Sequence, residues 1–488
     1  MNKMRILYLI LGLPLVLSAQ ILPDQVWLIG TNDLPGQPGY GNAVLKFESG
    51  QVSATTANLR MNFESTMAVM PDSLGNILFY TNGCHIANNS GDTMANGAGL
   101  NPGEMADWTC PTSGYASPMG AMALQVPGSQ HLYYLFHMGV KYSPERKLSY
   151  GPFYFSMVDM ALDGGKGAVV SKNKVVAEGD FEPFSAVRHG NGRDWWLVFP
   201  EYGTNKYHKI LFSNQGIQTV ESQEIGQALS CRYIGSSAFS PDGSRYARQQ
   251  HCGVVVMDFD RCSGMLFNAR SVGMPLRAIL GGGVAFSKDG NKLLVSTQLS
   301  IQTADLTLPV PVLDTVVGTI DIVGASLLQM QYAPNGKIYL SNLGRTPAYH
   351  VINTPNEPTI GFQRRGLVLP DYVVRTLPNY PNYRLYDVPG SICDTLGINA
   401  PPVVGTSSPD APSLKIWPNP TQRHLSLEAE SPITEIVIFD ALGRACVHLQ
   451  PSQMVNTLTI DVGYLPKGLY FITGKLDGKF WFGKFVKA

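Results

Sequence analysis

Short apolar runs, separated by turns rich in Pro, Asp, Asn and Gly, recur along most of the chain. In each copy an aromatic residue precedes the turn and a second apolar run follows it. The clearest copies are residues 238–247, 285–295 and 331–340. Their turn glycines, Gly243, Gly290 and Gly336, follow one another at steps of 47 and 46 residues. Asp-Gly and Asn-Gly favour tight hairpin turns, and a four-stranded propeller blade takes about 40 to 50 residues, so the pattern predicts a β-propeller.

Weaker copies of the pattern precede these three, at residues 70–80, 125–135 and 187–197. A seventh blade can be assembled from both ends of the region, with residues 25–29 and 42–47 as early strands and residues 382–387 as a late one. Such a shared blade closes the ring without leaving an exposed sheet edge. The expected fold is therefore all-β, a seven-bladed β-propeller, with six or eight blades as alternatives. Unrelated hairpins with similar turns are the remaining interpretation.

The two ends of the chain differ from the repeats. Residues 1–19 read as a signal peptide, because Lys3 and Arg5 precede an apolar stretch that is shorter than the ~20 residues needed to span a bilayer. Residues 393–412 have the Pro, Ser and Gly content of a linker. Residues 413–488 alternate between apolar and polar positions in short segments, which predicts a small immunoglobulin-like β-sandwich. The propeller is thus assigned to residues 20–392, and export without a transmembrane segment is expected.

Four short motifs follow one another in residues 413–488. They are Ile-Trp-Pro-Asn-Pro at 416–420, Phe-Asp-Ala-Leu-Gly-Arg at 439–444, Leu-Pro-Lys-Gly-Leu-Tyr at 465–470 and Lys-Phe-Val-Lys at 484–487. In a chain with a signal peptide, this set resembles the type A C-terminal sorting domain carried by substrates of the Bacteroidota type IX secretion system. Trp417 stands where that family usually has Tyr, and Ala488 follows the terminal Lys.

The resemblance implies an export route. The folded protein would pass from the periplasm through the outer membrane to the medium or the cell surface, with the type IX secretion machinery and a sortase-like peptidase as partners. The sorting signal would consist of Pro418, Asn419, Pro420, Gly443, Arg444, Gly468, Tyr470, Lys484, Val486 and Lys487. Loss of Lys484, Val486 or Lys487 is expected to damage export most. The alternative is that these residues only hold the sandwich together.

The repeat region also resembles WD40-like propellers of secreted and gliding-associated proteins in the same phylum. The resemblance is carried by residues 79–83, 94–97, 126–128, 133–136 and 258–264. It implies a fold and no established activity.

The cysteine count fits an oxidising compartment. Of seven cysteines, Cys446 lies in the tail, and the other six can pair. Cys84 and Cys110 are the favoured pair, because the Asn- and Gly-rich stretch between them has little apolar content to fix it. Cys252 and Cys262 flank one strand and turn, so either could pair with Cys231, and Cys393 is the sixth. No Cys-x-x-Cys is present, so zinc is not expected.

Charge and motif content narrow the functional classes. Lys+Arg and Asp+Glu are both 36, so no net field attracts nucleic acid or an anionic membrane. The commonest local signatures of serine hydrolases, zinc peptidases and nucleotide hydrolases are absent from the sequence. Asp258 and Asp260 could begin a calcium loop, although Cys262 stands where a third oxygen ligand is expected. Strand alternation explains that pair equally well, and no other cofactor is expected.

Aromatic residues provide the ligand-binding candidates. Trp195 and Trp196 are adjacent, so on a strand they point to opposite faces, and one of them could stack on a sugar. Tyr380 and Tyr383 could line a propeller mouth or pack where the ring closes. The leading hypothesis is a non-enzymatic exported propeller that binds a protein or a glycan. The alternatives are an extracellular hydrolase acting on polysaccharide or peptide, and a structural or adhesion component.

Overall fold

The structure is a computed structural model. It describes residues 21–31, 39–142, 148–230, 235–274, 282–317, 327–342, 344–357, 359–373, 375, 377–398, 414–440, 445–451, 453, 455–476 and 479–488. The expected signal peptide and most of the expected linker lie outside these residues. The chain divides into two compact units, Met1–Asn399 and Ala400–Ala488. None of the helices among the described residues is long and apolar enough to cross a membrane.

The described part of the first unit consists mainly of antiparallel β-sheets, as expected. A three-stranded sheet contains β1 (Val26–Thr31), β2 (Gly41–Glu48) and β3 (Gln51–Ala57). An eight-stranded sheet contains β4 (Ala68–Pro71), β5 (Ile77–Thr81), β6 (His85–Asn88), β7 (Thr93–Ala98), β8 (Ala121–Gln125), β9 (Leu132–Tyr142), β10 (Leu148–Asp159) and β11 (Ala168–Ala177). The short helices are η1 (Pro23–Gln25), α1 (Glu104–Thr109) and η2 (Asp163–Gly165).

Four-stranded sheets follow in chain order. They are formed by β12 (Ser185–Arg188), β13 (Trp195–Pro200), β14 (Lys206–Ser213) and β15 (Gly216–Glu224); by β16 (Ser236–Phe239), β17 (Arg245–Gln250), β18 (Gly253–Phe259) and β19 (Leu266–Gly273); by β20 (Val284–Phe286), β21 (Lys292–Ser296), β22 (Ile301–Asp305) and β23 (Asp314–Val317); and by β24 (Leu327–Tyr332), β25 (Ile338–Asn342), β26 (Thr346–Ile352) and β27 (Phe362–Val373).

The three clearest repeats are hairpin turns that join the first and second strands of the last three of these sheets. In each turn the glycine amide donates a hydrogen bond to the carbonyl three residues earlier, at 2.8 Å for Gly243, 3.0 Å for Gly290 and 3.0 Å for Gly336. All three glycines have positive φ, between 71° and 79°, which other residues adopt only with strain. The spacing seen in the sequence therefore corresponds to one sheet per repeat.

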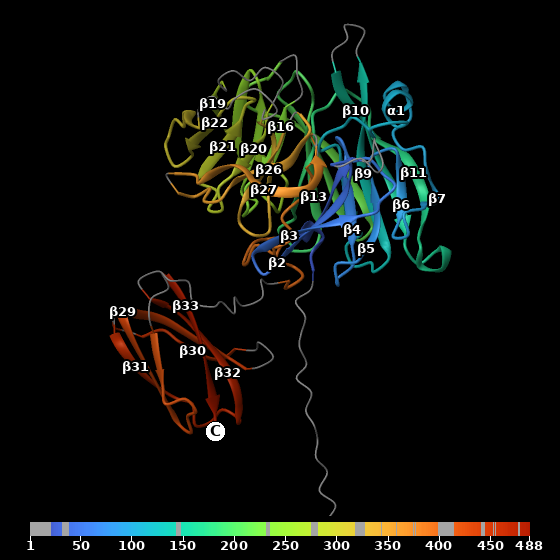
Figure 1. Ribbon diagram of the computed structural model, residues 1–488. Coiled ribbons are helices and arrows are strands. Elements are labelled where there is room, and N and C mark those ends of the chain that lie inside the picture. Colours follow the sequence, from blue (N-terminus) through green and yellow to red (C-terminus); the bar gives the residue numbers. More distant parts are fainter. Residues whose placement is uncertain are drawn as a thin grey trace, which may run out of the picture. The chain divides into compact units, whose positions relative to one another are not determined.

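The sheets form a closed, propeller-like arrangement (Figure 1). Hydrophobic clusters join neighbouring four-stranded sheets: one contains residues of β16–β19 and β20–β23, and the next contains residues of β20–β23 and β24–β27. The cluster around Trp27 contains residues of β1–β2, of β4–β6 and of β25–β27. The last four-stranded sheet therefore packs against the first sheet of the chain, which closes the ring through side-chain packing.

The expected late strand at residues 382–387 does not join the first sheet. Among the described residues, its backbone pairing is an isolated bridge between Asp387 and Asn191. Pro378 and Pro381 have no backbone N–H, so the approach to this segment cannot form a regular ladder. Cys393, the first residue of the expected linker, forms a disulfide with Cys262 within the first unit.

The second unit is a β domain in which the described strands are connected through one long strand. The strands are β28 (Leu414–Trp417), β29 (His424–Phe439), β30 (Ala445–Leu449), β31 (Val455–Asp461), β32 (Gly468–Leu476) and β33 (Lys479–Lys487). The first half of β29 pairs with β28 and β31, and its second half pairs with β30 and β32. Short segments were expected throughout this region, whereas residues 424–439 form a single long strand with a change of partner. The core of the second unit contains Leu425, Ile436, Ile438, Ile472 and Phe485.

Candidate functional site

Residues 377–388, here called the central segment, contact most sheets of the first unit through side-chain hydrogen bonds. The Tyr380 hydroxyl donates to the carbonyls of Val26 in β1, at 3.0 Å, and Val69 in β4, at 3.1 Å. The Asn379 amide donates to the carbonyls of Met119, before β8, at 2.8 Å and Phe184, before β12, at 2.7 Å. Two side chains therefore connect four strands that are distant in sequence.

The next residues extend this contact around the ring. The Asn382 amide donates to the carbonyl of Pro241, after β16, at 2.7 Å, and the Tyr383 hydroxyl donates to that of Ala123 in β8 at 3.3 Å. From the last sheet, the Gln331 amide donates to the carbonyl of Tyr380 at 3.4 Å. Burial raises the pKa of both tyrosine hydroxyls, so they remain protonated donors. The side chains thus provide the bonds that the prolines prevent the backbone from making.

A cavity of about 660 Å³ lies between the central segment and the first strands of several sheets. Its walls come from β12, β16, β20 and β24, and its rim includes the turns that follow β16, β20 and β24. The polar lining residues are Asp24, Ser185, Ser237, Ser240, Asp242, Lys288, Gln331, Tyr332, Asn335, Asn379, Tyr380, Asn382 and Arg384. A volume in the range of about 300 to 1,000 Å³ is typical of small-molecule sites.

Charged groups at this cavity are of both signs. Burial raises the pKa of Asp24 in spite of its ion pair with Arg384. Burial alone would also raise the pKa of Asp242, but hydrogen bonds from Ser240 and Ser244 outweigh it and lower the pKa. The cavity therefore contains two carboxyl groups whose pKa values are shifted in opposite directions. Lys288, on the turn after β20, is exposed.

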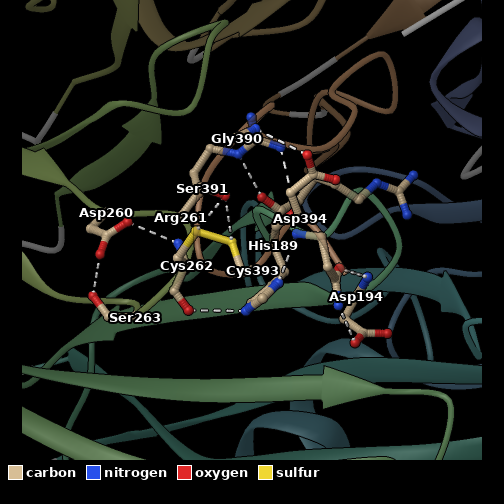
Figure 2. The surroundings of a disulfide bond; sticks show 12 residues. His189, Asp194, Asp260, Arg261, Cys262, Ser263, Gly390, Ser391, Cys393 and Asp394 are labelled. Atoms are coloured by element: carbon tan, nitrogen blue, oxygen red, sulfur yellow. Dashed lines mark hydrogen bonds between the residues drawn. A yellow bond between two sulfur atoms is a disulfide. The ribbon is translucent and has the colours of Figure 1, made fainter. Parts of the chain in front are cut away.

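Shortly after the central segment, Cys393 forms a disulfide with Cys262, in the turn after β18 (Figure 2). Asp260 holds this turn, because its carboxylate accepts hydrogen bonds from the Cys262 amide at 2.9 Å and the Ser263 hydroxyl at 2.6 Å. His189 lies beside it with one ring nitrogen 3.0 Å from the Cys262 carbonyl oxygen.

The cysteine pairing is partly as expected. Cys84 and Cys110 form a disulfide, which confirms the favoured pair. The alternative pairing of Cys262 with Cys231 is wrong, because Cys262 pairs with Cys393 across 131 residues of sequence. Cys252 is also disulfide-bonded, whereas Cys231 lies outside the described residues. Sequence spacing could not identify the long-range pair, since Cys393 appeared to belong to the linker.

Trp195 and Trp196 both lie in the hydrophobic core. Trp195 is 2% exposed, with the Arg188 guanidinium 3.7 Å from its ring centroid, and Trp196 is 4% exposed. The Trp196 indole N–H donates to the carbonyl of Arg261 at 3.0 Å. The expectation that one of them stacks on a sugar is therefore corrected, because neither indole has an exposed face. Tyr380 does line the cavity, and Tyr383 packs edge-on against Trp195.

The expected calcium loop at Asp258 and Asp260 is a turn with other partners. Asp260 holds the Cys262 turn as described above, and Asp258 accepts a hydrogen bond from the Asn268 amide at 2.9 Å. In the part of the chain that the structure describes, no group of three or more His, Cys, Asp or Glu side chains could hold a metal ion.

In the second unit, two distant motifs of the expected sorting signal meet. The Asn419 side chain accepts a hydrogen bond from the Val486 amide at 2.9 Å and donates one to the Lys484 carbonyl at 3.2 Å. Thr421 forms a parallel bridge with Lys487. Lys484 and Val486 are exposed, while Lys487 is 7% exposed.

The other motif residues have separate positions. Pro418 and Pro420 flank Asn419 and are exposed, and Gly468 begins β32. Tyr470 is buried, donates to the Pro466 carbonyl at 2.9 Å and stacks on Phe485. Gly443 and Arg444 lie outside the described residues.

Comparison with known proteins agrees with this part of the chain. Residues 415–488 match the family described as the secretion system C-terminal sorting domain. The match indicates a secreted substrate of the type IX secretion system, exported from the cell or to its surface. No curated protein matches.

Solved structures resemble the chain weakly. A putative 6-phosphogluconolactonase from Bacteroides uniformis shares 14% identity and a TM-score of 0.40, over 72% of this chain and 98% of that one. A second putative 6-phosphogluconolactonase, from Bacteroides fragilis, shares 13% identity and a TM-score of 0.41, over 72% of this chain and 97% of that one. A protein from Lactobacillus plantarum shares 14% identity and a TM-score of 0.43, over 71% of this chain and 97% of that one.

Proposed function

We propose that this protein is an exported seven-bladed β-propeller that binds an uncharged polar ligand, in the first place an oligosaccharide, in its central cavity. The blade count takes β4–β7 and β8–β11 as separate blades, since a single parallel residue pair, Ala95 with Ala168, joins them. The three-stranded first sheet is then the blade that completes the ring. A type A sorting tail, removed by a sortase-like peptidase on arrival at the surface, would deliver it.

The cavity is the observation that supports binding. Its lining combines hydroxyl and amide groups with apolar walls and with aromatic side chains, among them Phe239, Phe286 and Tyr332. Sugars are bound by this combination of hydrogen-bonding groups and apolar ring faces. Opposite charges at the rim leave no strong field for an anion or a cation. A rigid ring needs no catalytic group to serve as such a platform.

The test is a binding screen of the full chain, produced with its disulfides formed, against a glycan array with turnover followed in the same wells. We expect saturable binding without product. Lys288→Ala and Asn335→Ala at the cavity should weaken binding roughly 5- to 30-fold, because each removes a polar contact worth about 1–2 kcal/mol. Lys174→Ala, an exposed change on β11, is the matched control and should bind like wild type. If the protein bound a peptide library and no glycan, the ligand would be a protein segment and the proposal of an oligosaccharide ligand would be wrong.

A second candidate, a hydrolase, is favoured by Asp24 and Asp242. Two carboxyl groups with pKa values shifted apart are the arrangement that general acid–base chemistry uses. Release of product in the screen, abolished by both Asp24→Asn and Asp242→Asn, would establish hydrolysis and overturn the binding proposal.

A further inference from the structure

Asp387, at the end of the central segment, is a buried carboxylate without a partner. It is 6% exposed, and both of its carboxylate oxygens lack a hydrogen-bond donor. The other buried carboxylates among the described residues have donors: Glu182 is bonded by Arg248, Asp194 by Arg193 and Asn191, and Asp24 by Arg384. An ionised carboxylate that is buried without compensation is costly, so a missing partner is indicated at Asp387.

A second carboxylate, Asp394, lies at the other end of the same loop. Its Oδ2 accepts a hydrogen bond from the Gly390 amide at 3.0 Å, and this bond folds its side chain back over the loop 388–393 (Figure 2). The two carboxyl groups lie within hydrogen-bonding reach of each other, and after burial the charge of Asp394 is the next cause that raises the pKa of Asp387. Asp394 is half-buried, so the pair can be reached by solvent.

Arg261, whose charge acts on Asp387, does not complete this site. The Arg261 guanidinium donates to the carbonyls of Arg188, at 2.9 Å, His189, at 3.4 Å, and Tyr386. Its charge lowers the pKa of Asp387 in part, but its hydrogen bonds are directed at backbone oxygens. When Asp387 and Asp394 are both ionised, neither carboxylate can donate a hydrogen bond to the other. A bound cation would compensate the charge of both carboxylates.

We propose that Asp387 and Asp394 bind a divalent cation, in the first place calcium. Carboxylate oxygens, backbone carbonyls and water are the ligands that calcium prefers. The remaining ligands would be water on the exposed side of Asp394. The bound ion would tie the two ends of the loop between residues 387 and 394, which also contains Cys393.

The experiment is a calorimetric titration of the metal-stripped, oxidised full chain with CaCl2 and, separately, MgCl2. We expect one saturable calcium site with a Kd of roughly 10⁻⁴ to 10⁻³ M, as in extracellular modules, and weaker magnesium binding. Thermal unfolding should shift upward with calcium, because a ligand that binds only the folded state stabilises it.

Two variants separate the site from a folding effect. Asp387→Asn places an amide donor beside Asp394, so the variant should unfold at a temperature no lower than wild type without calcium and should lose the upward shift with calcium. Asp394→Asn should also lose calcium binding. Asp258→Asn, which removes a carboxylate of the other acidic pair, is the control and should keep it.

Three results would overturn the proposal. The first is the absence of saturable calcium binding up to about 10 mM, beyond the weakest extracellular modules. The second is binding that survives in both Asp387→Asn and Asp394→Asn. The third is a wild-type protein that is stabilised by acid and not by calcium, which would mean that the two carboxyls share a proton.

Discussion

His137 is a buried polar side chain whose ring nitrogens both have hydrogen-bond partners. The imidazole is fully buried in β9, with one ring nitrogen 2.6 Å from Asn101 Oδ1 and the other 2.9 Å from the Ser156 hydroxyl oxygen. Since the Ser156 oxygen also accepts the Asn173 amide, its proton points to the ring. A neutral tautomer therefore satisfies all of these groups. Burial lowers the pKa of His137 to about 3.

This lowered pKa predicts acid sensitivity. In the unfolded chain a histidine binds its proton near pH 6.5, whereas folded His137 stays neutral, so acid favours unfolding. Between about pH 6.5 and pH 4 this group should reduce the free energy of unfolding by up to ~1.4 kcal/mol per pH unit. Urea unfolding of wild type and His137→Gln across this range tests it. Equal slopes for the two proteins would contradict the prediction.

The Glu182–Arg248 ion pair is a second residue-scale feature with a measurable effect. Both side chains are buried, and Arg248 donates from Nε to Glu182 at 3.0 Å and from Nη2 at 2.5 Å. Glu182→Ala leaves a buried charge without its partner and should cost about 3–5 kcal/mol of unfolding free energy. The exposed pair Lys141–Asp180 is the control: Asp180→Ala should cost below ~1 kcal/mol. If Glu182→Ala and Asp180→Ala lost similar amounts of unfolding free energy, burial would not determine the contribution of these ion pairs.

At the residue scale the sequence was a weak guide to the cavity. Trp195 and Trp196 attracted attention because they are large and adjacent, but alternation on β13 buries both between packed sheets. Asp242 and Lys288 are part of the repeated turns that were recognised, and their position at a cavity depends on the closure of the ring. No local pattern contains that information.

At the scale of elements, the repeated hairpins were predictable because a turn and its flanking strands are adjacent in sequence. The central segment was not predictable from the sequence, because its hydrogen-bond partners are distributed over the whole first unit. Residues 382–387 were expected to be the late strand of a shared closing blade, but among the described residues their backbone pairing is a single bridge. The prolines beside them exclude a regular ladder, and side chains of Asn379, Tyr380 and Asn382 replace it.

The Cys262–Cys393 disulfide should be the more stabilising of the two described bridges. Its sequence separation is 131 residues, against 26 for Cys84–Cys110. Loop-closure entropy then gives about 5 kcal/mol for the long loop and about 3.5 kcal/mol for the short one. Guanidinium unfolding of the two double Cys→Ser variants measures the order. A larger loss from Cys84→Ser with Cys110→Ser would refute it.

At the scale of the whole molecule, the sorting domain was recognised from its motifs, and the structure adds that the first and last of them are in contact. Asn419 holds the backbone of β33 at Val486 and Lys484, so the first motif positions the last. Asn419→Ala should therefore reduce secretion in the native host and leave folded protein in the periplasm. Immunoblots of medium and periplasm would measure this.

A matched change separates positioning from general damage to the domain. Arg423→Ala removes an exposed ion pair with Asp461 at 3.4 Å in the same unit and should leave secretion at the wild-type level. If Asn419→Ala is secreted normally, the contact between the motifs is structural only.

The place of the central segment in the chain sets an order of events during synthesis. The central segment is made near the end of the first unit, and the sorting domain is made after it. A chain interrupted before residue 377 lacks both the piece that completes the ring and the tag for secretion. The order of the two segments would therefore keep incomplete propellers from being secreted.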